Sequence, residues 1–132
     1  MTDRKVIQSS DAPLPIGPYS QAIETGEWVY CSGQIPLDPK TGLLVQGDTA
    51  SQAGRILDNL DAVLKAAGSS LEETVKLTVF MTNLGEFDSL NRVLAGRFTR
   101  VPLPARSVVQ VTALPKGASI EMDIVALKKK QE

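Results

Sequence analysis

Residues 49–67, TASQAGRILDNLDAVLKAA, carry the clearest structural signal in the chain, and residues 75–82, VKLTVFMT, follow soon after. In the first stretch, apolar residues recur every three or four positions, which is the period of one helix face. Thr49 and Gln52 match a capping box at its start, and Gly68 suits a left-handed residue at its end. In the second stretch, apolar side chains alternate with others, as in a strand. One strand face is expected to hold Val75, Leu77, Val79 and Met81.

Upstream of this helix, the chain is rich in turn residues and short extended segments. Residues 20–25 and 28–32 flank Gly26-Glu27, a pair that suits a two-residue hairpin turn. Downstream, apolar residues at helical spacing predict a second helix that begins at residue 85 or 86 and ends at Phe98. Its buried stripe consists of Phe87, Leu90, Val93, Leu94 and Phe98.

Two further strands are predicted after the second helix, at residues 105–111 and 119–127, with a turn at 114–117 between them. Because only this short turn separates them, the two strands are candidates for antiparallel pairing. The order is strands, helix, strand, helix, strand, strand. This order predicts an α+β fold, in which two helices cover one face of a mixed sheet. The length of 132 residues fits a single domain over residues 1–132.

Composition excludes several classes of function. The net charge of −1 disfavours nucleic-acid binding, which needs a basic surface. The chain has no histidine, so a Ser-His-Asp triad and the usual zinc sites are excluded. Cys31 is the single cysteine, which leaves no intrachain disulfide and suits a reducing compartment. No segment is apolar and long enough for a signal or a membrane span, so we expect a soluble, cytoplasmic protein. The missing histidine and the missing cofactor motifs agree with a protein that needs no metal or cofactor.

Two charged residues stand out in the predicted strands. Arg106 lies in an extended, mostly apolar run and, if buried, needs an anion. Its partner could be a protein carboxylate, which the residues alone favour, or a ligand carboxylate gripped by the planar guanidinium. Glu121 shares a strand face with Asp123, and two acids on one face usually mark the solvent side. If the last two strands pair, Glu121 comes near Arg106 and becomes a candidate acid or base.

Three more residues are candidates with a strong structural alternative. Tyr19 follows a Gly-Pro turn and suits packing more often than ligand contact. Gly33 follows a strand and would allow a ligand or backbone to approach closely, or it simply ends the strand. Asn91 lies on the second helix outside the apolar stripe, where an ordinary surface residue is the simplest interpretation.

Taken together, these segments resemble the RidA/YjgF family, also called the endoribonuclease L-PSP family. The matching segments run in order along nearly the whole chain. They are IGPYSQA (16–22), CSGQIP (31–36), DNL (58–60), VKLTVF (75–80), Asn91, PARS (104–107) and LPKGASIE (114–121).

The resemblance implies a chorismate-mutase-like fold and a homotrimer. In that family three sheets form an inner barrel, helices lie outside, and sites lie between neighbouring subunits. It also implies that Arg106 and Glu121 are functional. Arg106 would bind a substrate carboxylate, and Glu121 would orient a water molecule and move protons. Tyr19, Gly33 and Asn91 would line the pocket.

One position departs from the family pattern. Many family members have cysteine two residues after the arginine, and this chain has Val108. A thiol nucleophile is therefore impossible there, although the backbone N–H of Val108 can still serve as a contact.

The implied reaction is hydrolysis of reactive 2-imino acids, or their enamine tautomers, to 2-keto acids and ammonia. 2-Iminobutanoate and 2-iminopropanoate are examples of such substrates. Alternatives are a deaminase for a different imine, a trimer that binds or senses a keto acid without turnover, and ribonuclease activity. The last fits least, because the sequence is acidic and lacks a basic, aromatic stripe.

Overall fold

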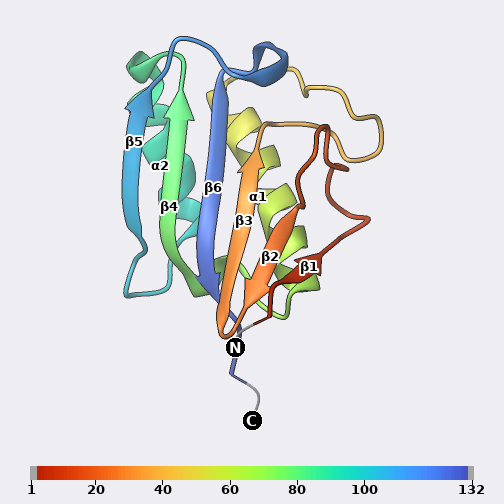
Figure 1. Ribbon diagram of the computed structural model, residues 1–132. Helices are drawn as coiled ribbons and strands as arrows, with labels where there is room; N and C mark the ends of the chain where they lie inside the picture. The colour runs from red at the N-terminus through yellow and green to blue at the C-terminus, as the bar shows by residue number, and fades with distance from the viewer. Residues whose placement is uncertain (1–2, 131–132) are drawn as a thin grey trace.

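The computed structural model describes residues 3–130. The chain folds into a six-stranded mixed sheet with two α-helices packed on one face (Figure 1). The two helices are α1 (Thr49–Ala66) and α2 (Phe87–Arg97). Three short 3-10 helices are η1 (Leu71–Glu73), η2 (Leu84–Glu86) and η3 (Pro115–Gly117). The strands are β1 (Lys5–Ile7), β2 (Ala22–Thr25), β3 (Trp28–Gln34), β4 (Thr74–Met81), β5 (Ala105–Gln110) and β6 (Ile120–Leu127). The predicted α+β class is confirmed. Only β1, a three-residue strand too short for a sequence pattern, was not predicted.

The strand order β1-β2-β3-β6-β4-β5 differs from the expected pairing of the last two strands. β5 pairs only with β4, in parallel, and β6 lies between β3 and β4, antiparallel to both. The expected β5–β6 pairing is therefore wrong. The physical reason is the crossover: α2 joins β4 to β5 as a parallel unit, and β6 then takes the free edge of β4.

The hydrophobic core lies between the sheet and the two helices. Fully buried side chains of α1 include Ile56, Leu57, Leu60 and Leu64, and they meet buried β6 residues such as Met122 and Ile124. β4 contributes Leu77, Val79 and Met81, as predicted, but Val75 is 37% exposed. The register between β4 and β6 shifts between Thr74 and Lys76, so Val75 lies at an irregularity of the strand. At such a bulge the alternation of side chains between the two faces is interrupted, which explains why Val75 is exposed.

The ends of α1 agree with the prediction except at the cap. Asp48, and not Thr49, is the N-cap: its side chain accepts a hydrogen bond from the Ser51 N–H at 2.9 Å. These hydrogen bonds lower the pKa of Asp48, because they favour the ionised carboxylate. At the other end, Gly68 has φ of +75°, as expected for a residue that ends a helix.

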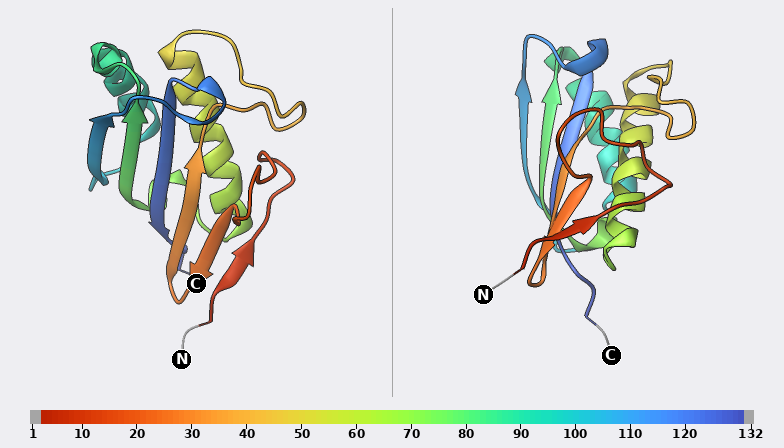
Figure 2. Two further views of the ribbon diagram at one scale, coloured as in Figure 1. Left: turned by 45° about the horizontal axis from the view of Figure 1, so that its top comes forward. Right: turned by 45° about the vertical axis from the view of Figure 1, so that its right-hand side comes forward.

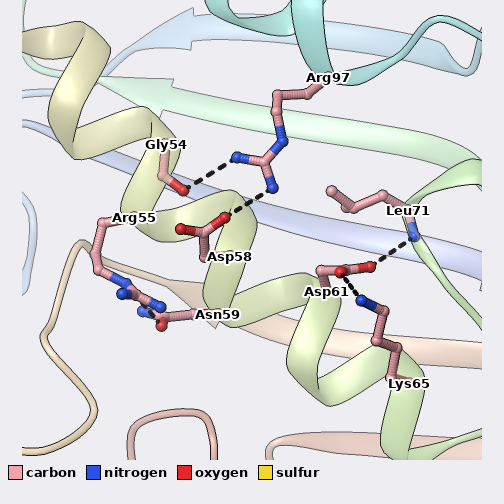
Figure 3. Close-up of polar contacts among 8 residues, drawn as sticks. All are labelled: Gly54, Arg55, Asp58, Asn59, Asp61, Lys65, Leu71 and Arg97. Carbon is pink, nitrogen blue, oxygen red and sulfur yellow. Dashed lines mark hydrogen bonds and ion pairs between the residues drawn. The ribbon is translucent and has the colours of Figure 1, made fainter.

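Polar side chains fasten α1 to its neighbours (Figure 3). Arg97 of α2 donates to Asp58 Oδ1 at 2.9 Å and to the Gly54 carbonyl at 3.4 Å. Asp61 accepts from the Leu71 N–H at 3.2 Å and pairs with Lys65 one helical turn away. The Arg97 contacts anchor the last turn of α2, so that α2 stays fixed above β4 and β5.

Among residues 3–130, both α-helices lie on one face of the sheet and leave the opposite face uncovered (Figure 2). Large side chains are exposed there, including Trp28 at 40% and Tyr30 at 47% on β3. Val109 of β5 is 44% exposed on the same side. An uncovered sheet face with aromatic and branched side chains is typical of a surface that contacts another molecule. Within residues 3–130, neither helix has the length and apolar character needed to cross a bilayer.

Candidate functional site

Arg106 lies at the sheet edge and points toward α2. It pairs in register with Leu77 of β4, which is buried beneath the helices, so Arg106 shares that face. Its Nη1 donates to Asn91 Oδ1 at 2.6 Å, and its guanidinium carbon lies 5.4 Å from the centre of the Phe87 ring. An amide and an aromatic face therefore orient the guanidinium without neutralising it.

Arg106 is exposed, and no carboxylate of residues 3–130 lies within ion-pair distance of it. The interpretation of Arg106 as half of a structural salt bridge is therefore wrong. The interpretation of Asn91 as an ordinary surface residue also fails, since it holds the arginine. The remaining guanidinium donors are available to an anion from outside the chain.

Val108 lies two residues further along β5 and is half-buried against the core. Val111 donates its N–H to the Met81 carbonyl of β4 at 2.8 Å. Because backbone N–H groups alternate in direction along a strand, the Val108 N–H points to the free edge of the sheet. We call Phe87, Asn91, Arg106 and Val108 the cationic half.

A hollow of about 260 Å³ adjoins Arg106 and Asn91. We call it the Arg106 pocket. Its other walls are apolar and come from α2, β4 and the segment before β5: Leu77, Leu94, Ala95, Phe98, Leu103 and Pro104.

Glu121 lies on the uncovered face of β6, opposite Phe80 of β4. Its carboxylate extends over Gly33 of β3: a β-carbon added to Gly33 would lie 2.5 Å from Glu121 Oε2. Gly33 is therefore not a plain strand end, because any side chain there would displace the carboxylate. We call Tyr19, Gly33 and Glu121 the acidic half. They line a second hollow of about 300 Å³, the Glu121 pocket, together with Ile16, Ser32, Ile35 and Pro115.

The loop that carries Tyr19 is held by a buried amide. Gln21 is 2% exposed, accepts from the Ser9 N–H at 2.6 Å and donates to the Pro13 carbonyl at 2.8 Å. Tyr19 itself is 44% exposed, and its hydroxyl accepts from the Ile16 N–H at 3.2 Å. The ring of Tyr19 thus borders an open hollow, and its contact with a ligand stays a prediction.

Glu121 of the acidic half and the neighbouring Asp123 both have raised pKa values. Burial raises the pKa of Glu121, and the neighbouring Asp123 charge raises it further. Burial also raises the pKa of Asp123, although hydrogen bonding to Thr78 and the charge of Lys76 oppose this. These side chains lie on the uncovered face but are half-buried, so the expectation of a plain solvent face is only partly right.

Cys31 has no nucleophilic character in this setting. It is buried, and the pKa of its thiol is raised to about 12. Burial is the larger cause, and the negative charge of Asp123 is the smaller one. A thiol with such a pKa stays protonated near neutral pH. The prediction of a small buried apolar group is confirmed. Within residues 3–130, no three His, Cys, Asp or Glu side chains are grouped as a metal site would require.

The two halves lie on opposite faces of one sheet. Arg106 is in register with Leu77, whereas Glu121 is in register with Phe80, three residues along β4 and so on the other face. The expectation that Glu121 lies near Arg106 is therefore wrong within one chain. The sequence pattern missed this because it placed β5 beside β6.

Three contributing residues were not identified from the sequence. Phe87 was assigned to the buried stripe, but its ring supports the Arg106 guanidinium. Its spacing of four residues from Asn91 puts both on one helix face, and this spacing was the available signal. Gln21 gave no signal, because only the folded loop shows its carbonyl partners. Asp123 was noted only as a surface acid.

Comparison with known proteins agrees with this geometry. The family model described as Endoribonuclease L-PSP matches residues 9–128. The 2-iminobutanoate/2-iminopropanoate deaminase of Mus musculus is 42% identical over 125 residues, covering 95% of this chain and 92% of the relative. The chain belongs to the RidA/YjgF family.

Other RidA/YjgF relatives carry different names. Protein DfrA of Myxococcus xanthus is 49% identical over 126 residues, which cover 94% of this chain and 95% of that protein. The crystal structure of YyfA from Yersinia pestis, described as a Rid-family protein of unknown function, is 45% identical. It superposes with a TM-score of 0.91 and covers 95% of this chain and 99% of that one. The RidA/YjgF fold is thus shared along nearly the full length of these proteins.

Proposed function

We propose that the protein hydrolyses 2-imino acids to 2-keto acids and ammonia, at sites shared between copies of the chain in a homotrimer. The observation that carries this proposal is the exposed Arg106 guanidinium, which Asn91 and Phe87 orient but no described carboxylate neutralises. A fixed, unpaired guanidinium suits bidentate binding of a ligand carboxylate. The name of the mouse relative, 2-iminobutanoate/2-iminopropanoate deaminase, supports the imine as the reacting group.

Glu121 supplies the proton transfers. As a carboxylate it takes a proton from water while the oxygen attacks the carbon of the protonated imine, which gives a neutral carbinolamine. It then returns the proton to the amine nitrogen. The C–N bond breaks, ammonia leaves, and the carbinol O–H loses its proton through Glu121 to solvent. A raised pKa brings a carboxyl group closer to the pH of the reaction and improves it as a proton carrier.

The sharing of the site between copies follows from the opposite faces of the two halves. A ligand on Arg106 cannot reach Glu121 of the same chain without crossing the sheet. A neighbouring copy can bring its acidic half to the free edge of β5, where the Val108 N–H also points. The uncovered faces with Trp28 and Tyr30 would then turn inward and be covered.

The proposal is tested by the turnover of 2-iminobutanoate, which a dehydratase forms from threonine in the assay. Semicarbazide traps the imine that has not been hydrolysed, so the trapped product measures the decay of the imine. We expect wild type to accelerate the decay and Arg106→Ala to lower kcat/KM by on the order of 100-fold. Arg92→Ala is the matched control, because Arg92 is an exposed arginine on α2, next to Asn91 in the chain, and its side chain bonds to Ser89. We expect it to keep wild-type activity.

Two results would contradict the proposal. A folded wild type that accelerates no imine would remove the deaminase assignment, and keto-acid binding under those conditions would favour a sensing role for Arg106. Equal losses in Arg106→Ala and Arg92→Ala would show that charge in general, and not a carboxylate clamp, matters.

A further inference from the structure

We propose that the hydroxyl of Ser32 is the hydrogen-bond acceptor for the nitrogen of the substrate, and that it distinguishes an imine from the corresponding keto acid. This inference rests on the proposed function and adds a specificity-determining residue to it. It follows from the position of Ser32 beside Glu121 and from the hydrogen bond that its hydroxyl donates.

Ser32 lies in the Glu121 pocket, next to the group that moves protons. It lines this pocket together with Gly33, the residue that follows it in β3. The Glu121 carboxylate extends over Gly33, since a β-carbon added there would lie 2.5 Å from Glu121 Oε2. A ligand atom that contacts Glu121 in this pocket is therefore close to the Ser32 hydroxyl as well.

The hydroxyl proton of Ser32 is already used in a hydrogen bond. Ser32 Oγ lies 2.6 Å from the Ser20 carbonyl oxygen. A carbonyl oxygen only accepts, so the hydroxyl must be the donor, and it has a single proton to give. Among residues 3–130, no second side-chain hydrogen bond involves Ser32 Oγ. Ser32 therefore presents only lone pairs to the pocket and acts there as an acceptor.

Two hydrogen bonds hold this acceptor in place. The Ser32 backbone N–H donates to the Gln21 carbonyl at 2.9 Å, and the hydroxyl bonds to Ser20, the residue before Gln21. Because the two partners are consecutive in the chain, the Ser32 side chain cannot rotate without losing a hydrogen bond. An acceptor that is fixed in advance needs no rearrangement when a donor arrives.

An acceptor at this point suits a nitrogen better than an oxygen. The protonated imine carries N–H bonds, and the nitrogen still carries them in the carbinolamine and in the ammonia that leaves. A keto acid has a carbonyl oxygen where the imine has its nitrogen, and this oxygen has lone pairs but no proton. Lone pairs of Ser32 would then face lone pairs of the product, and no hydrogen bond would form. Ser32 thus favours binding of the imine over binding of the keto acid.

The first test uses two stable ligands that differ in one ring atom. Pyrrole-2-carboxylate has a planar N–H on the carbon that carries its carboxylate, whereas furan-2-carboxylate has an oxygen there. We expect the wild type to bind the pyrrole about tenfold more tightly in calorimetry, because a site built for a donor rejects the analogue that lacks one. In Ser32→Ala the ratio of the two Kd values should fall toward one.

Ser69→Ala is the matched control for the lost structural hydrogen bond. Ser69 also donates its hydroxyl to a main-chain carbonyl at 2.6 Å, that of Leu127, in a partly buried setting. It follows the end of α1 and does not line the Glu121 pocket. We expect Ser69→Ala to keep the pyrrole-to-furan ratio of the wild type.

A second variant serves if Ser32→Ala folds poorly. Ser32→Cys keeps the shape of the side chain but presents sulfur, which is a weak acceptor. It should lose the preference for pyrrole-2-carboxylate as Ser32→Ala does.

Turnover gives an independent readout of the same contact. With 2-iminobutanoate, Ser32→Ala should lower kcat/KM by at least about tenfold, because a hydrogen bond to a charged nitrogen is lost. Inhibition by 2-oxobutanoate should stay as in the wild type or become stronger. A purely structural role would instead weaken both ligands together.

The outcomes separate this inference from the proposed function. A pyrrole-to-furan ratio that Ser32→Ala and Ser32→Cys leave intact would overturn the acceptor role, even with slower turnover, and would leave the deaminase standing. A wild type that hydrolyses no imine, yet prefers the pyrrole through Ser32, would remove the deaminase and support the acceptor for a nitrogen ligand.

Discussion

The cationic half and the acidic half solve the problem of positioning a charge in different ways. In the first, side chains do the work: Asn91 and Phe87 hold an exposed guanidinium against α2. In the second, the missing side chain of Gly33 leaves room for the Glu121 carboxylate, and the buried Gln21 amide donates to carbonyls of the loop that carries Tyr19. The cationic half should therefore be sensitive to side-chain removal, and the acidic half to added atoms.

The largest effect that sharpens this comparison is expected from Gly33→Ala. The new β-carbon would lie 2.5 Å from Glu121 Oε2, so the carboxylate must move. Because a displacement of about 1 Å can cost a hundredfold in rate, we expect kcat to fall about 100-fold while keto-acid binding at Arg106 changes little.

Gly96→Ala is the matched control for that change. Gly96 lies on α2, where an added β-carbon would meet nothing in the described residues within 4 Å beyond its chain neighbours and the helix's own backbone. It should gain about 0.5–1 kcal/mol of stability from the helix preference of alanine and keep its activity. Equal activity of the two alanine variants would contradict the role given to Gly33.

A smaller effect is expected from Asp123→Asn, measured as the pH profile of kcat. Glu121 acts as a base, so activity rises as pH passes upward through its raised pKa. Removing the Asp123 charge takes away one cause of that raised pKa. The acid limb should therefore move to lower pH. Asp11→Asn, a change in an exposed loop, should leave the acid limb of the pH profile where it is in wild type. If the acid limb of Asp123→Asn also stays in place, the charge of Asp123 does not influence the pKa of Glu121.

The smallest effect on activity is expected from Asp48→Ala, which lies outside both halves. Its folded-state pKa is lowered, so its contribution to stability is present above the unfolded-state pKa and is lost as pH falls through the folded-state pKa. Thermal unfolding should show a lower Tm than wild type at neutral pH and a shrinking difference in acid. Thr49→Ala should change Tm less. The reverse order would make Thr49 the cap.

The sequence predicted the helices and most strands because burial on one side gives them a clear period. β4 and β6 alternate, and α1 shows an uninterrupted apolar face. The sequence did not predict the strand order. The short turn before β6 suggested that β6 pairs with β5, but the crossover through α2 places β5 parallel to β4, and β6 pairs with the other edge of β4. The sequence also could not show which face Arg106 takes, since β5 is an edge strand with little contrast in burial. The family resemblance identified Arg106 and Glu121 as site residues, but only the strand register shows that they lie on opposite faces of the sheet.

The claim that one site combines halves of two copies is tested most directly by mixing two inactive variants. The variants Arg106→Ala and Glu121→Gln are co-expressed with different tags and purified as mixed assemblies. Arg106→Ala keeps an intact acidic half, and Glu121→Gln keeps an intact cationic half. If the site is shared, one of the three interfaces in each mixed trimer carries both intact halves, and about one third of wild-type imine hydrolysis should return. Activity no higher than that of the separate variants would contradict the shared site.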